Sequence, residues 1–303
     1  MKVSLVDVDG TGFPNFALMK LSAWHKAQGD TVDWYSPMFS RPDRIYASKI
    51  FTFSPDYEDY YAGDPEPIRG GTGYDATVKL PDEIDGMTPD YSVYPSVDYA
   101  IGFLSRGCIR KCPWCVVPRK EGMIRKYSSL ETISCGRRNI VLMDNNFLAN
   151  DPAFIREQVD ISVRMKLRLD FNQGLDARLV NEENARLFCR IHWMKYIRFS
   201  CDTQSSIEPV INAMRLLRRA SGYRKEFFIY FLAVDAEETH DRIMRVMGAD
   251  TGTITPFVMP YRNLDGDGQI VSEDTKRLAR WANRVWIRKS CSFENYNPKN
   301  HNP

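Results

Sequence analysis

Long hydrophobic runs are missing from this sequence of 303 residues, and so is a strong excess of charge of either sign. A transmembrane helix needs about 18 or more consecutive apolar residues, and no such stretch occurs. Lys and Arg total 41 against 39 for Asp and Glu, a formal net charge of +2. The start of the chain, 1–5, leads into no long apolar region of the kind that directs secretion. We therefore expect a soluble, cytoplasmic protein in reducing conditions, where disulfides are rare.

Histidine is scarce as well, with four residues in the chain. A structural zinc ion usually takes four ligands from two separated pairs of Cys or His. One cluster of cysteines is present, but no second pair of Cys or His stands at a usable spacing from it. The sequence therefore argues against a zinc site.

The one grouped set of cysteines is Cys108, Cys112 and Cys115, in the run Arg106-Gly107-Cys108-Ile109-Arg110-Lys111-Cys112-Pro113-Trp114-Cys115. Three thiolates at CxxxCxxC spacing can bind three irons of a 4Fe-4S cluster and leave the fourth iron open for another ligand. The remaining cysteines are scattered, and we expect them to be small buried residues; they are Cys135, Cys189, Cys201 and Cys291.

This run resembles the defining motif of the radical S-adenosylmethionine (SAM) superfamily, in which an aromatic or bulky apolar residue, here Trp114, precedes the last Cys. The resemblance implies a 4Fe-4S cluster on Cys108, Cys112 and Cys115, with SAM bound to the open iron. It also implies that a reducing partner such as flavodoxin or ferredoxin supplies an electron that cleaves SAM. The resulting 5'-deoxyadenosyl radical abstracts a hydrogen from a substrate, which the resemblance does not identify.

From Val97 onward, patterns typical of strands alternate with helical patterns, which indicates an α/β protein with a parallel sheet. The candidate strands are Tyr99–Leu104, Asn139–Met143, Leu167–Asn172, Tyr196–Cys201, Phe227–Val234 and Thr253–Pro260. These six are too few for a complete eight-stranded barrel. Six is the number of strands in the partial (β/α)6 TIM-like barrel that the resemblance implies, and we assign this barrel to residues 96–260. Residues 261–303 are expected to form a C-terminal helix, Ser272–Lys289, and a tail.

Residues 1–95 predict a small open-sheet Rossmann-like α/β domain followed by a connector rich in Pro and Gly. Strands are expected at Lys2–Asp9, Thr31–Tyr35 and Arg44–Phe53, with a helix after the first. The order resembles the cobalamin-binding domain of one radical SAM branch. Its DxHxxG run is absent, because Thr11 and Pro14 stand at the His and final Gly positions. This argues against cobalamin, although some members of that branch bind it without the His.

In barrels of parallel strands the working residues sit at the carboxyl ends of the strands. Asp144, Asn145 and Asn146 follow the second strand, where many family members carry a Gly-Gly-Glu run that receives the SAM ammonium. Their side-chain oxygens are acceptors suited to that ammonium. An Asx turn that caps the next helix is the structural alternative, and the two roles are compatible.

The next strand is followed by Asn172, Gln173 and Arg178, a polar group of a kind that suits a ligand contact. The guanidinium of Arg178 fits the SAM carboxylate, but it fits equally well an ion pair with Asp176 or Glu182 on the surface. After the fourth and fifth strands, the resemblance implies contacts to the ribose or methionine part of SAM and to its adenine; the residues are Ser200, Asp202 and Val234.

Charge is distributed unevenly along the chain. Residues 1–95 carry 8 basic and 15 acidic side chains, and residues 96–303 carry 33 and 24. The basic part favours an anionic small molecule or a nucleic acid as substrate, including a methyltransferase or methylthiotransferase acting on RNA or a nucleoside. Compensation of the cluster's charge, or docking of an acidic electron donor, explains the same residues equally well. A noncatalytic iron-sulfur protein is the remaining alternative.

Overall fold

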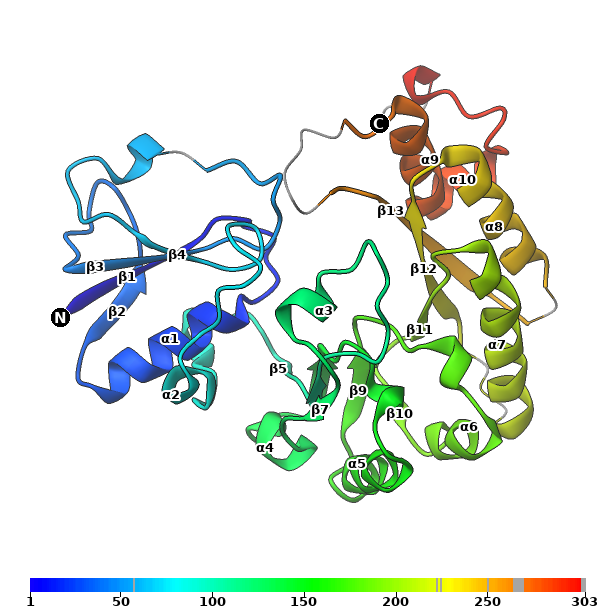
Figure 1. Ribbon diagram of the computed structural model, residues 1–303, viewed down its shortest axis with the longest axis horizontal. Coiled ribbons are helices and arrows are strands. Elements are labelled where there is room, and N and C mark those ends of the chain that lie inside the picture. Colours follow the sequence, from blue (N-terminus) through cyan, green and yellow to red (C-terminus); the bar gives the residue numbers. More distant parts are fainter. Residues whose placement is uncertain (57, 222, 224, 250, 264–269, 301–303) are drawn as a thin grey trace. The chain divides into compact units, whose positions relative to one another are not determined.

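The computed structural model describes residues 1–303 except 57, 222, 224, 250, 264–269 and 301–303 (Figure 1). The chain divides into two compact units, one of Met1–Asp98 with Trp114–Gly122 and the other of Tyr99–Pro113 with Met123–Pro303. Both are mixed α/β structures built on parallel sheets. Every helix in the described residues is too short or too polar to cross a bilayer.

The first unit is an open parallel sheet in the order β2-β1-β3-β4. The helix between β1 and β2, α1, packs along this sheet (Figure 1). Buried Val3 and Leu5 lie on the same face of the sheet as Tyr46, which bonds to His25 of α1, and buried Ile45 lies on the opposite face with Tyr35 and Tyr61. The bounds are β1 (Lys2–Asp7), α1 (Phe16–Ala27), β2 (Thr31–Trp34), β3 (Arg44–Ser48), β4 (Ile68–Gly70), α2 (Asp82–Asp85) and α3 (Val117–Lys120), with 3-10 turns at Glu58–Tyr61 and Tyr91–Val93.

The predicted strand Arg44–Phe53 ends early, because β3 stops at Ser48. The carboxylate of Asp9 accepts hydrogen bonds from the backbone N–H groups of Ile50, at 2.6 Å, and Phe51, at 3.2 Å. Backbone N–H groups that donate to a side chain cannot also donate to a neighbouring strand, so the strand pairing ends there. The apolar pattern continues past this point, which explains why the sequence overestimates the strand.

The second unit holds a parallel sheet in the order β10-β9-β8-β5 and another in the order β11-β12-β13. A single parallel bridge between Leu175 and Phe199 connects the segment after β9 to β11. The strand bounds are β5 (Ala100–Gly102), β6 (Ser105–Arg106), β7 (Arg125–Lys126), β8 (Asn139–Leu142), β9 (Arg168–Phe171), β10 (His192–Trp193), β11 (Ile197–Ser200), β12 (Phe227–Ala233) and β13 (Ile254–Pro260). The predicted strands of residues 96–260 are confirmed with slightly shorter bounds.

Helices follow the strands of this unit, and α6, α7 and α8 pack in succession (Figure 1). Side chains of β12 alternate between buried and half-buried positions, so one face of the strand is fully covered and the other is partly open. The helix bounds are α4 (Leu130–Ser134), α5 (Pro152–Arg164), α6 (Glu182–Phe188), α7 (Ile207–Ser221), α8 (Ala236–Gly248), α9 (Glu273–Asn283) and α10 (Val285–Ser290). Short 3-10 turns lie at Phe147–Ala149, Ala177–Leu179, Gln204–Ser206 and Pro298–Asn300.

The single helix predicted at Ser272–Lys289 is wrong, because α9 and α10 are separate. The side chain of Asn283 accepts a hydrogen bond from the backbone N–H of Val258, at 2.6 Å, and donates one to its carbonyl, at 3.0 Å. These bonds tie the end of α9 to β13, and the extended backbone of Arg284 then breaks the helix. Part of the predicted segment 261–303 lies outside the described residues, at 264–269 and 301–303.

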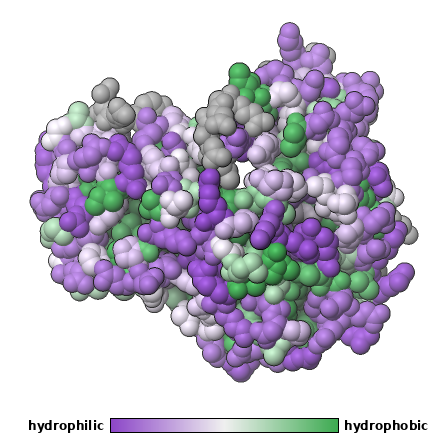
Figure 2. Space-filling view, in the orientation of Figure 1, coloured by the Kyte–Doolittle hydropathy of each residue, from purple (hydrophilic) through white to green (hydrophobic). Residues whose placement is uncertain are grey.

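Hydrophilic side chains predominate on the face seen in Figure 2, and hydrophobic side chains form separate patches among them. The exposed apolar residues of the first unit include Met38 and Phe39, which are 78% and 84% exposed.

Arg242 ties α8 to the ends of β11 and β12, and its side chain is buried. It donates hydrogen bonds to the carbonyls of Cys201 and Leu232 and to the Glu238 carboxylate. Replacement by Met (Arg242→Met) leaves these buried carbonyls without donors, so we expect the free energy of unfolding to fall by about 2 to 4 kcal/mol. Urea denaturation measures this.

The matched control is Arg245→Met on the same helix. Arg245 is exposed and bonds to the Gln204 side chain at 3.1 Å. Its loss is expected to change the free energy of unfolding by less than about 0.5 kcal/mol. Equal losses in the two variants would contradict the role assigned to Arg242.

Candidate functional site

The thiol of Cys108 lies among N–H donors in the second unit. Its sulfur accepts a hydrogen bond from the backbone N–H of Arg110 and another from the side-chain amide of Asn146, each at 3.3 Å. Cys108 is half-buried. Both donors therefore point at the sulfur, the atom by which a cysteine binds metal.

The predicted acidic residue after β8 anchors the segment that leads into the cysteine run. Asp144 accepts hydrogen bonds from the backbone N–H groups of Leu104, at 3.0 Å, and Ser105, at 2.7 Å, and from the Ser105 hydroxyl at 2.7 Å. Burial raises the pKa of Asp144 to about 6, against the opposing effect of these bonds. Next to it, the Asn145 side chain accepts from the backbone N–H of Gly107 at 2.8 Å. Both side chains thus shape the loop.

A buried carboxylate, Asp176, joins the residues around Cys108. One of its oxygens accepts from Arg178 Nε at 2.7 Å, and the other accepts from Arg110 Nε at 2.9 Å and from Asn146 Nδ2 at 3.3 Å. Burial by itself would raise the pKa of Asp176, but the hydrogen bonds from Arg178 and Arg110 outweigh it and hold the pKa below the usual range. The carboxylate is therefore ionised at neutral pH and fixes both guanidinium groups.

The ion-pair alternative for Arg178 is therefore realised, although its partner is buried rather than on the surface. Sequence reasoning missed Asp176 and Arg110 as members of the site. The available signal was the position of Asp176, which follows the β9 strand end and caps the turn Ala177–Leu179. Nothing in the sequence indicated that Arg110, 66 residues earlier, would share this carboxylate.

Asn146 carries a buried oxygen that the described residues leave without a donor. The residue is 3% exposed, and its Oδ1 has no hydrogen-bond partner in the described part of the chain. Its Nδ2 faces the Cys108 sulfur and the Asp176 carboxylate, both of which are acceptors, so the orientation of the amide is fixed. A buried acceptor without a donor needs an explanation, and a bound ligand is one.

Electrostatic interactions link Arg178 to two more predicted residues, Cys112 and Asp202. Burial raises the pKa of the Cys112 thiol, and the positive charge of Arg178 opposes that effect. Burial also raises the pKa of Asp202, whose carboxylate accepts from the backbone N–H of Leu232 at 3.2 Å. Cys108, Cys112 and Asp202 therefore share one electrostatic environment around Arg178.

Four of the predicted site residues are not hydrogen-bonded to the group around Cys108 and Asp176. Side-chain amides of Asn172 and Gln173 approach the Met143 sulfur at 3.8 and 3.9 Å, and Gln173 is exposed. Ser200 is half-buried at the end of β11, and Val234 is 68% exposed. Across the residues that the structure covers, no hydrogen bond joins these four to Cys108 or Asp176.

Trp114 and Cys115 belong to the first unit, because the division between units falls after Pro113; both are half-buried. All seven cysteines lie in the described part of the chain, and none of them is in a disulfide. Groups of three or more His, Cys, Asp or Glu side chains arranged to hold one metal ion do not occur among the described residues. The ligands of a 4Fe-4S cluster bind separate irons, so such a cluster needs no grouping of that kind.

The expectation that the scattered cysteines are buried is confirmed for Cys201 and wrong for Cys135 and Cys189, which are exposed; Cys291 is half-buried. Cys135 caps α4 in a left-handed conformation, with φ of 45°, which places it at the surface. Burial raises the pKa of Cys201 to about 12, so this thiol stays protonated at neutral pH.

Comparison with protein-family models gives no match, and comparison with curated proteins gives no significant match.

Asp176→Asn removes the anion that Arg110 and Arg178 share, so we expect the free energy of unfolding of the apoprotein at about pH 7 to fall by about 1 to 3 kcal/mol. The folded pKa of Asp176 lies below its unfolded value of 3.8, so its contribution is complete above that value. The contribution is lost as the pH falls through the folded pKa. The difference between wild type and variant should therefore shrink in acid, which denaturation at several pH values measures.

The matched control is Asp160→Asn, which removes an exposed carboxylate paired with Arg190 at 2.7 Å. Such surface pairs contribute about 0 to 1 kcal/mol to the free energy of unfolding. A difference for Asp176→Asn that stays constant from neutral pH into acid would contradict the role of its charge.

Proposed function

We propose that this protein is a radical SAM enzyme, which reductively cleaves SAM at a 4Fe-4S cluster and abstracts a hydrogen from a substrate. The observation that carries the proposal is the run of Cys108, Cys112 and Cys115 with Trp114 before the last Cys. The cluster, when bound, supplies the electron that cleaves SAM to the 5'-deoxyadenosyl radical. The chain's own residues hold, orient and shield these groups.

The donor set around the cysteines fits a cluster. None of the three cysteines is in a disulfide, and the Cys108 sulfur has two N–H donors already in place. Hydrogen bonds to ligating sulfurs and nearby charge are the means by which a protein sets a cluster's reduction potential. The positive charges of Arg110 and Arg178 offset part of the negative charge that thiolate ligands bring.

Two side chains fit the amino-acid part of SAM. The buried Oδ1 of Asn146 is an acceptor that lacks a donor within the described chain, which suits the SAM ammonium. Arg178 is held by Asp176 through Nε, and its two terminal nitrogens are free of other partners in the residues described. Those nitrogens are the natural fork for a carboxylate. Asp144 is less suited to the ammonium than its position in the sequence suggests, since Leu104 and Ser105 already occupy it.

The strand order supports a partial (β/α)6 barrel as the scaffold. The parallel strands β5, β8, β9, β11, β12 and β13 follow one another across the two sheets, and the Leu175–Phe199 bridge continues the series from β9 to β11. A reducing partner such as flavodoxin or ferredoxin belongs to the proposal, and the basic balance of residues 96–303 favours an anionic substrate. Thr11 stands where the axial His would be, which argues against cobalamin as a further cofactor.

The test is anaerobic reconstitution with iron and sulfide, followed by addition of SAM and dithionite. We expect about four irons per chain and formation of 5'-deoxyadenosine. Cys108→Ala, Cys112→Ala and Cys115→Ala should each abolish the product, whereas the exposed-cysteine controls Cys135→Ala and Cys189→Ala should leave it unchanged. An intact cluster that yields no 5'-deoxyadenosine, or a cluster retained when all three cysteines are replaced, would overturn the proposal.

Asn146→Leu tests the two roles assigned to this side chain. Loss of the N–H donor to Cys108 should shift the cluster's reduction potential to a more negative value, because the bond stabilises the more electron-rich state. Loss of Oδ1 should weaken SAM binding. Potentiometric titration and SAM binding measure the two effects. Asn139→Leu, at the opposite end of β8, is the matched control and should alter neither; a potential unchanged in Asn146→Leu would refute the sulfur contact.

A further inference from the structure

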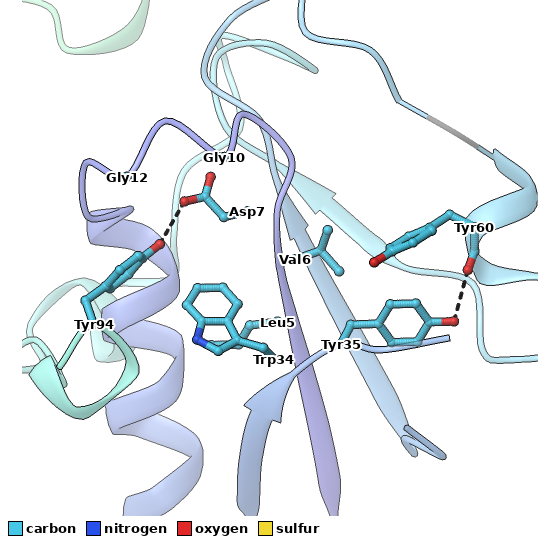
Figure 3. A pocket seen from close by; sticks show the side chains of 9 residues that line it. All are labelled: Leu5, Val6, Asp7, Gly10, Gly12, Trp34, Tyr35, Tyr60 and Tyr94. Atoms are coloured by element: carbon cyan, nitrogen blue, oxygen red, sulfur yellow. Dashed lines mark hydrogen bonds between the residues drawn. The ribbon is translucent and has the colours of Figure 1, made fainter. Parts of the chain in front are cut away.

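A pocket separate from the cysteine run opens in the first unit, at the carboxyl end of β1. Its volume is about 330 Å³, and nine of the described residues line it. Figure 3 shows Trp34 and Tyr94 on one flank, Tyr35 and Tyr60 on the other, and Asp7 at the end of the strand between them. A volume of this size is at the lower end for small-molecule sites.

The sheet topology places this pocket where open α/β domains bind ligands. In the order β2-β1-β3-β4 the chain leaves β1 toward β2 on one side and returns to β3 on the other. The connections that follow β1 and β3 run to opposite sides, and ligands of open sheets usually bind outside the carboxyl ends of the strands near such a point. The pocket lies beside that point, at the carboxyl end of β1 on the side of β2. Leu5 pairs with Trp34 on β2, so the carboxyl ends of β1 and β2 lie level at the pocket.

The aromatic walls are arranged as two corners. The ring centroids of Trp34 and Tyr94 are 5.2 Å apart with planes at 73°, and those of Tyr35 and Tyr60 are 5.3 Å apart at 71°. In each pair the edge of one ring packs on the face of the other, so the pair offers no two parallel faces between which a planar ligand could stack. Each aromatic face carries negative quadrupole charge, which attracts cations.

The charge of the lining has one sign. Asp7 supplies the single carboxylate among the nine lining residues, and none of them is Lys, Arg or His. Asp7 accepts a hydrogen bond from the Tyr94 hydroxyl at 2.9 Å, and no cationic side chain in the described part of the chain pairs with it. Burial raises the pKa of Asp7. The ionised carboxylate is therefore less stable here than in water, because it lies beside aromatic rings and has no counter-charge. The Asp7 carboxylate would repel a phosphate or carboxylate ligand, whereas a bound cation would stabilise its ionised form.

We propose that this pocket binds an organic ammonium cation, of the quaternary or highly substituted amine class, with its charge set against the aromatic corners and Asp7. Trp34 and Tyr60 are 40% and 42% exposed, so the ligand can enter from solvent. The site is independent of the proposed cluster chemistry, because its residues come from the first unit and include none of the cysteines.

Choline and its neutral isostere 3,3-dimethylbutan-1-ol test the proposal by calorimetric titration of the full chain. The two probes have the same shape and differ in charge. A desolvated cation–π contact contributes enough to make choline bind at least about 10-fold more tightly. Equal binding of the two probes would overturn the proposal, because shape alone would then explain it, and so would absence of choline binding.

Variants locate the site. Asp7→Asn keeps the size of the side chain and its ability to accept from Tyr94, and Tyr60→Leu truncates a side chain that is largely in solvent. Each should weaken choline binding about 10-fold. Asp33→Asn, exposed on β2, and Phe39→Leu, 84% exposed outside the pocket, are the matched controls for charge and ring loss and should bind as wild type. Choline affinity that is unchanged in both pocket variants would overturn the assignment, and circular dichroism checks that each variant folds.

Discussion

The candidate site depends on the buried carboxylate of Asp176. Without it, the two guanidinium groups of Arg110 and Arg178 would repel each other, and the amide of Asn146 would lose one of its two acceptors. Because Arg110 lies inside the cysteine run and Arg178 follows β9, a single anion couples the cysteine run to the end of a strand. Preorganisation of this kind is what a cofactor site requires of its protein, since the cofactor supplies the chemistry.

Buried or half-buried aspartates act in the same way elsewhere in the chain. Asp144 accepts hydrogen bonds from the backbone N–H groups of Leu104 and Ser105, and Asp9 accepts hydrogen bonds from backbone N–H groups that follow β3. In each case a carboxylate accepts backbone donors that would otherwise lack partners once the strand ends. The loops at the carboxyl ends of the strands, where both proposed ligand sites lie, are therefore shaped by short acidic side chains.

Asp7 differs from these residues, and the difference separates the two units chemically. Asp176 is neutralised by two arginines, whereas the hydrogen-bond partners of Asp7, which are the Tyr94 phenol, the Gly10 backbone and the Asn15 side chain, are uncharged. A carboxylate that is already paired holds structure in place. One that lies in an aromatic pocket without a counter-charge retains attraction for a cation from outside. The acidic balance of residues 1–95 and the basic balance of 96–303 follow the same division of roles.

Local patterns in the sequence determined the longer strands of both units and the cysteine run, because alternation of apolar residues and the spacing of three thiols within eight positions are properties of short segments. The two- and three-residue strands β4, β6, β7 and β10 were not predicted. Tertiary structure alone decided where β3 and α9 end, since Asp9 and Val258 act across the fold. It also decided that Asp176 meets Arg110 and that Asp7 lines a pocket together with four aromatic side chains. Those contacts join residues far apart in the chain, and they exist only once the strands have taken their order in the sheet.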